Sequence, residues 1–215
     1  MAALDEHPEL LPFAQGDIPG YVLDRHTQSR WSVRLWGHLG PLWAGSLSLG
    51  LSNASVSILR GFARQDGGGR WTAEFLLAPS AGAPDLRGLD FLGLAFGAQA
   101  PDDSSPVVLS QYALDGGPDL GAALYLEVRG PDRLGFLGSL LRSLARLGLS
   151  PRQMYISTRE DEAYDRFLLK TVSGGVPGEE VRRALETRLE ESLAAARRRP
   201  PSTGAPTLPT AAGGR

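Results

Sequence analysis

Hydrophobic and polar positions follow their clearest pattern between residues 122 and 196. Residues 123–129 alternate apolar and polar side chains with the period of a half-buried strand. Gly130-Pro131 ends this strand, Asp132 is placed to cap a helix, and apolar positions recur with helical spacing from Phe136 to Leu147. The opposite, polar face of this helix carries Ser139, Arg142, Ser143 and Arg146. The pattern predicts a strand and then an amphipathic helix that ends at Gly148.

Two further strands and a second helix are predicted downstream. Met154, Ile156 and Thr158 share one face of the first of these strands, and Asp165, Phe167 and Leu169 share one face of the next. Thr158 and Asp165 are interpreted as a polar pair across the two strands. A helix with Glu179 and Glu180 in its first turn and arginines at its end follows, which suits the helix dipole. The predicted order is strand, helix, strand, strand, helix.

The front half repeats this order more weakly. A strand alternates from Trp31 to Trp36, a helix is expected over 41–51, and residues 66–69 (DGGG) form a hairpin turn between two strands. A short helix over 85–94 and a strand over 107–114 would complete the repeat. The second half lacks an obvious last strand, and residues 20–26 are the segment that could supply one.

Composition narrows the class of protein. The 215 residues have a formal net charge of -2 and contain no cysteine, so disulfides, thiolate metal sites and cysteine nucleophiles are excluded. The charge provides no basic surface for nucleic acid, and no apolar run is long enough to cross a membrane. We therefore expect a soluble, cytoplasmic protein that binds neither nucleic acid nor membrane.

The segment Val128-Arg129-Gly130-Pro131-Asp132-Arg133-Leu134-Gly135-Phe136-Leu137 resembles the strand-to-helix signature of ACT domains, particularly those of the uridylyltransferase and ACR-like type. In that family the pattern is G-x-D-R-x-G-L-L after an apolar strand. The segment from Gly37 to Leu42 keeps the glycines but lacks the Asp-Arg pair. The resemblance implies an α+β fold of two ferredoxin-like βαββαβ modules, each an antiparallel sheet with helices on one face.

The predicted organisation has four parts. They are an N-terminal extension (1–26), a divergent ACT-like module (27–116), a second ACT module (121–198) and a disordered tail rich in proline, glycine and alanine (199–215). Modules of this family typically bind an amino acid or a similar small effector, which implies a regulatory, allosteric role and no cofactor.

A strand that ends in glycine and leads into a helix leaves backbone N–H groups unpaired at the helix start, where they suit a carboxylate. Asp132 would accept a hydrogen bond from an ammonium group, and Arg133 would bind a carboxylate. The predicted ligand-binding residues are Gly130, Pro131, Asp132, Arg133, Leu134, Gly135, Phe136 and Leu137.

The sequence leaves a second interpretation of these residues open and gives a third, catalysis, little weight. Each of these residues also has a structural role in a strand-to-helix turn, so the chain could be a protein-interaction module whose pocket is vestigial. Catalysis has little support, because the three histidines form no paired-ligand motif and no GxSxG or HExxH pattern occurs. We expect a non-catalytic regulator that forms a homodimer and binds a small effector, with another protein as a second candidate partner.

Overall fold

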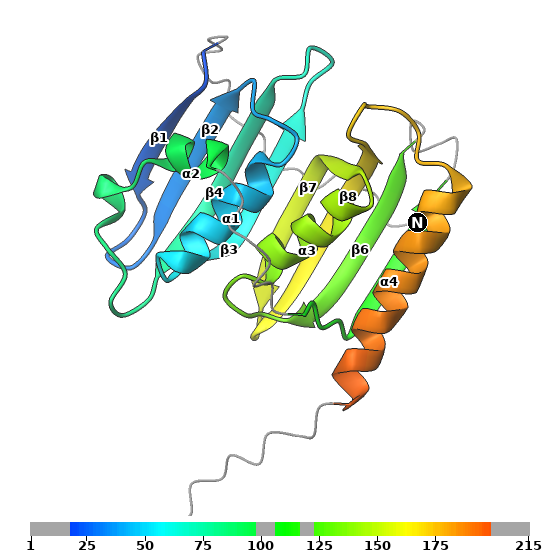
Figure 1. Ribbon diagram of the computed structural model, residues 1–215. Coiled ribbons are helices and arrows are strands. Elements are labelled where there is room, and N and C mark those ends of the chain that lie inside the picture. The colour runs from blue at the N-terminus through cyan, green and yellow to red at the C-terminus, as the bar shows by residue number, and fades with distance from the viewer. Residues whose placement is uncertain (1–17, 98–105, 117–122, 199–215) are drawn as a thin grey trace, which may run out of the picture.

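Eight antiparallel strands form one continuous sheet in a computed structural model that describes residues 18–97, 106–116 and 123–198 (Figure 1). The strand order is β1-β2-β4-β3-β7-β8-β6-β5. The strands are β1 (Gly20–Arg25), β2 (Trp31–Gly37), β3 (Val56–Gln65), β4 (Trp71–Pro79), β5 (Gln111–Gly116), β6 (Leu124–Pro131), β7 (Leu149–Arg159) and β8 (Glu162–Thr171). The chain is therefore an α+β protein built on a single sheet.

In the described residues, four α-helices and one 3-10 turn accompany the sheet, and these helices all lie on the same face of it (Figure 1). They are α1 (Trp43–Asn53), η1 (Leu86–Gly88), α2 (Phe91–Phe96), α3 (Phe136–Arg146) and α4 (Glu179–Arg198). Helices α1 and α3 lie next to each other over the centre of the sheet, while α2 and α4 cover its two ends. The predicted arrangement of antiparallel strands with helices on one face is confirmed.

The two halves of the chain repeat one element order, strand-strand-helix-strand-strand-helix, with the 3-10 turn η1 added in the first. Strands β3 and β7 join the halves through antiparallel pairing from Arg60↔Ser157 to Arg64↔Gln153. On the face away from the helices, the rings of Phe62 and Tyr155 meet across this junction with centroids 4.8 Å apart. The two halves thus share one hydrogen-bonded sheet.

Two strand assignments from the sequence were wrong. The segment over 107–114 was expected to close the front half, but β5 pairs with β6 and so belongs to the second half. Residues 20–26, expected as an extension or as a strand of the second half, contain β1, which pairs with β2 of the first half. The short 26–30 connection makes β1 and β2 a local antiparallel hairpin, which costs little loop-closure entropy. Each half therefore begins with its edge strand instead of ending with it.

Helix boundaries also differ from the prediction in two places. The single helix expected over 85–94 is two short pieces, because Asp85 and Asp90 each accept a hydrogen bond from a backbone N–H two or three residues ahead and each starts a new turn. Helix α3 begins at Phe136 with Gly135 as its N-cap, so Asp132 does not cap it. Its end agrees with the prediction, since Gly148 has a φ of 70° just beyond the helix.

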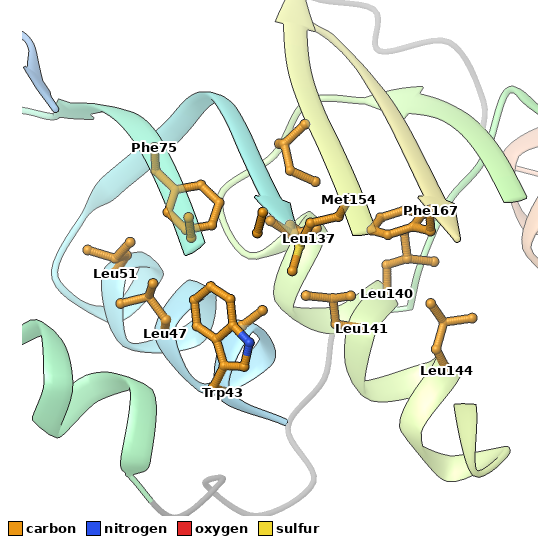
Figure 2. Close-up of a cluster of buried hydrophobic side chains, with 14 of the residues drawn as sticks. Trp43, Leu47, Leu51, Phe75, Leu137, Leu140, Leu141, Leu144, Met154 and Phe167 are labelled. Carbon is orange, nitrogen blue, oxygen red and sulfur yellow. The ribbon is translucent and has the colours of Figure 1, made fainter. Parts of the chain in front are cut away.

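One hydrophobic core runs beneath all the helices. Side chains from both halves meet in it, as the close-up of Trp43, Leu47, Leu51 and Phe75 beside residues of α3, β7 and β8 shows (Figure 2). The aromatic rings of Trp43 and Trp71 pack edge to face at 5.3 Å in the first half. Because the core is continuous, the position of α1 against α3 is set by packing as well as by the sheet.

Several predictions fall outside these observations. The proposed tail over 199–215 and most of the extension over 1–26 lie outside the described residues. The module boundaries 27–116 and 121–198 stay a prediction. Among the described residues, no helix is long and apolar enough to cross a membrane.

Candidate functional site

A small cavity of about 30 Å³ opens where the two halves of the protein meet. Its walls come from α1, the start of β3, the loop between β6 and α3, and the β7–β8 hairpin. A space of this size holds one or two water-sized groups. The cavity therefore suits a compact polar group held by both halves of the chain.

Six of the eight residues predicted from the sequence line this cavity. They are Asp132, Arg133, Leu134, Gly135, Phe136 and Leu137. Gly130 and Pro131 instead stay in the β6–β8 ladder, opposite Ala163 and Glu162. Gly130 is needed there for packing, since an added Cβ would lie 2.5 Å from the carbonyl oxygen of Val108. That the six residues bind an effector stays a prediction.

The start of α3 lies beside the cavity, and its first turn has no side-chain cap. Gly135 has a φ of 87°, a left-handed conformation that glycine adopts without strain, and no side chain caps the helix. The N–H of Asp132 donates to the carbonyl oxygen of Asp161 at 2.7 Å, which ties the loop to the β7–β8 turn. The uncapped first turn of α3 leaves N–H groups and the positive end of the helix dipole beside the cavity.

Asp165 is the most unusual polar residue of the site. It lies on β8 with 1% of its surface exposed, and its Oδ1 atom has no hydrogen-bond partner. Burial raises the pKa of Asp165 from 3.8 to about 8, and the nearby Asp132 adds to the rise, although the backbone N–H of Ser157 opposes it. The sequence paired Asp165 with Thr158, but Thr158 stands opposite Ala163. At neutral pH the Asp165 carboxyl group is therefore largely protonated.

Asp132 supplies a second carboxyl group on the same cavity. Burial raises its pKa, a hydrogen bond from the Thr158 hydroxyl lowers it, and the charge of Asp161 raises it further. Neither Asp132 nor Asp165 forms an ion pair with a cation among the described residues. Two acidic groups thus share a small space, and neither is ion-paired within the described part of the chain, although Arg133 also lines the cavity.

Helix α1 completes the cavity from the other half of the chain. Its serines Ser48 and Ser52 lie one turn apart and face the start of α3. An added Cβ on Gly135 would lie 3.1 Å from the Ser52 Oγ, and one on Gly138 would lie 3.4 Å from the Ser48 Oγ. These glycines therefore allow the two helices to approach closely and place hydroxyl groups at the cavity. The loop signature carried no information about these serines, since they lie some 80 residues earlier.

In the first half, apolar side chains occupy the positions that correspond to the cavity of the second half. Gly37 pairs with Trp71 as Gly130 pairs with Ala163, and Leu35 pairs with Ala73 as Val128 pairs with Asp165. A large tryptophan thus replaces a small alanine, and Ala73 replaces the buried acid. Leu39, two residues beyond the loop glycine as Asp132 is, is 5% exposed and belongs to the core. In the described part of the first half, the positions equivalent to Asp132 and Asp165 are therefore apolar.

Within the described residues, no cluster of three or more histidine, aspartate or glutamate side chains is arranged to hold a metal ion. No protein-family model matches the chain, and no curated protein sequence matches it. Among solved structures, the aspartate kinase from Synechocystis is similar, with a TM-score of 0.45 and 15% sequence identity. That match covers 76% of this chain and 27% of the kinase chain, so the chain spans about a quarter of its length. So weak a likeness supports no functional argument.

Proposed function

We propose that the chain is a non-catalytic regulatory protein that senses a small amino acid through the cavity at Asp132 and Asp165. The observation that carries this proposal is the buried Asp165 carboxyl group, whose Oδ1 atom is unpartnered at the cavity wall. A buried carboxylate without a counter-charge is costly, and a ligand cation would remove that cost. The ACT-like loop sequence at 128–137 supports the same conclusion.

The proposed ligand is a zwitterion with a small side chain. Its ammonium group would lie between Asp132 and Asp165, which supply the negative charge, with the Ser48 and Ser52 hydroxyls as further partners. Its carboxylate would bind the backbone N–H groups at the start of α3, beside Arg133. The volume of about 30 Å³ accommodates the ammonium group, so the carboxylate and the side chain would lie at the opening of the cavity, where a small side chain fits most easily.

The absence of a catalytic role is part of the proposal. Within the described ranges, the side chains on the cavity are carboxyl, hydroxyl, guanidinium and apolar groups, and no histidine or thiol lies beside a hydroxyl as a nucleophile–base pair would require. His26 and His38 are both exposed and lie outside the cavity. Binding that changes the packing of α1 against α3 would instead alter how the two halves fit together.

Calorimetry with each of the twenty amino acids at pH 8 tests the proposal. We expect one or a few small amino acids to bind the wild type and to lose at least tenfold in affinity in Asp165→Asn and Asp132→Asn. Asp90→Asn is the matched control, because it makes the same substitution at an exposed helix cap where asparagine caps equally well. Folded wild-type protein that binds no amino acid would contradict the proposal.

A protein-interaction module is the second candidate, favoured by the bare face of the sheet. No described element covers the face opposite the helices (Figure 1). This face carries the Phe62–Tyr155 pair at the junction of β3 and β7. The expected homodimer would use this face or a sheet edge. Light scattering of the wild type and a Phe62→Glu variant distinguishes the two candidates: a dimer lost in the variant, with no response to amino acids, would select the interaction module.

A further inference from the structure

The polar stripe of α3 and one face of α4 line the same cavity. Helical periodicity placed Ser139, Arg142, Ser143 and Arg146 on the polar face of α3. In the structure these four residues line a cavity of about 310 Å³, whose other wall includes Arg188, Glu191, Ser192 and Ala195 of α4. Each set has the i, i+3, i+4, i+7 spacing of one helix face, so two helices turn largely polar faces towards a shared space. Hydrophobic packing does not explain this arrangement.

The burial of the charged Arg142 side chain is the feature of this cavity that needs an explanation. It is 8% exposed, although it carries a full positive charge. It forms no hydrogen bond, ion pair or ring contact with any described residue. An arginine is rarely buried unless it is paired, because its charge loses hydration on burial. The guanidinium group on the cavity wall therefore lacks an anionic partner within the described chain.

We propose that this cavity between α3 and α4 binds a small phosphate-bearing anion through Arg142. The charges favour an anion, since Arg188 and Glu191 form an ion pair at 2.9 Å and Arg142 adds a further positive charge to the cavity wall. The planar fork of an arginine matches a phosphate with two parallel hydrogen bonds. Ser139 and Ser143 add hydroxyl donors on the same wall, one turn apart. The volume is sufficient for a phosphate ester or a diphosphate.

This site is separate from the proposed amino-acid cavity. The two share no lining residue, and Arg142 lies past the middle of α3 while the amino-acid cavity is at its start. Helix α3 contributes to both, so a ligand at either site contacts the same helix. Different variants therefore test the two proposals.

Titration of the full-length chain with inorganic phosphate, pyrophosphate and glycerol 3-phosphate, as three separate arms, tests the proposal. Binding is followed by calorimetry and by the ³¹P line width, with sodium chloride and sodium acetate at matched ionic strength as references. We expect at least one phosphate probe to bind and Arg142→Gln to weaken it at least tenfold. Arg183→Gln, on an exposed face of α4 where Arg183 pairs with Glu179, should bind as the wild type does.

The variants also separate a binding role from a structural one. Because Arg142 has no partner in the described chain, Arg142→Gln should unfold at the same or a higher temperature in the absence of phosphate. Arg142→Lys keeps the charge but cannot form the two-bond contact, so it should bind with an intermediate affinity; it also serves if the glutamine variant does not fold. Phosphate probes that act no more strongly than chloride on the wild type, or equally on Arg142→Gln, would overturn the proposal. Calorimetry with amino acids should be unchanged in Arg142→Gln, which keeps this test independent of the proposed function.

Discussion

Replacing Asp165 with asparagine should stabilise the ligand-free protein, and by an amount that depends on pH. The unfolded carboxyl group ionises above about pH 4, whereas the folded group keeps its proton until about pH 8, because burial raises its pKa. Between these values the unfolded state binds fewer protons than the folded state, so wild-type stability falls as pH rises. Asparagine resembles the neutral acid in shape and does not titrate.

The magnitude follows from the two pKa values. A folded pKa that lies one pH unit above the unfolded pKa corresponds to about 1.4 kcal/mol, so the cost of keeping Asp165 protonated approaches about 4 kcal/mol at pH 7 and vanishes near pH 4. The pH-dependent part of the gain in Asp165→Asn should therefore be near zero at pH 4 and should increase by up to about 1.4 kcal/mol per pH unit until about pH 8. This gain is a large fraction of the stability of a typical domain.

Urea denaturation of the wild type and of Asp165→Asn at pH 4, 5, 6, 7 and 8 measures this difference. The exposed Asp90→Asn variant is the matched control and should follow the wild type across the series. A difference between wild type and Asp165→Asn that stays constant over the whole range would refute the reasoning. It would mean that the surroundings of the carboxyl group stabilise its charged form, so that burial does not raise its pKa as far as stated.

Three further predictions concern the cavity and the junction of the halves. Amino-acid affinity should increase with pH, by up to tenfold per pH unit below pH 8, because the ligand ammonium prefers the ionised Asp165; calorimetry from pH 6 to 8 checks the slope. Gly135→Ala should lower the free energy of unfolding by about 1 kcal/mol or more, since its φ is 87° and the new Cβ would lie 3.1 Å from the Ser52 Oγ; chemical denaturation measures the loss. Gly61→Ala on β3 should lower the free energy of unfolding further, by about 2 kcal/mol, because its Cβ would lie 2.2 Å from the Phe75 ring in the core. Thermal melts of this variant and of Gly67→Ala, in the open hairpin turn, isolate the effect.

The strands and helices were largely predictable, because each depends on a local period. Alternation identified β2, β6 and β8, and the apolar stripe identified α3. The pairing of the edge strands was not predictable in this way, because alternation shows which face of a strand is buried but not which neighbour the strand has. For β1, the short 26–30 connection to β2 was the available signal, and it favoured the hairpin that the structure contains.

The candidate site shows a similar division. The loop residues from Asp132 to Leu137 could be found from their glycines and charges, because a strand-to-helix turn is a local feature. The buried position of Asp165 was also encoded, since it shares the side of β8 with Phe167 and Leu169, both of which are buried. Its interpretation as a polar pair with Thr158 across the two strands gave too little weight to that shared side. Ser48 and Ser52 reach the cavity only through the packing of α1 on α3, which no local pattern specifies.

The two halves of the sheet show how a repeated architecture can divide stability and binding between its copies. At equivalent positions the first half has Trp71, Ala73 and Leu39, and the second half has Ala163, Asp165 and Asp132. Trp71 and Leu39 fill the first half and add buried apolar area, which favours folding. The second half keeps a space and two acidic groups that lower stability when no ligand is bound. Because the halves share one core and the β3–β7 pairing, the folding free energy gained in the well-packed half offsets the destabilisation in the polar half. A ligand that neutralises the carboxylates should therefore stabilise the whole sheet, and it should do so with one molecule per chain.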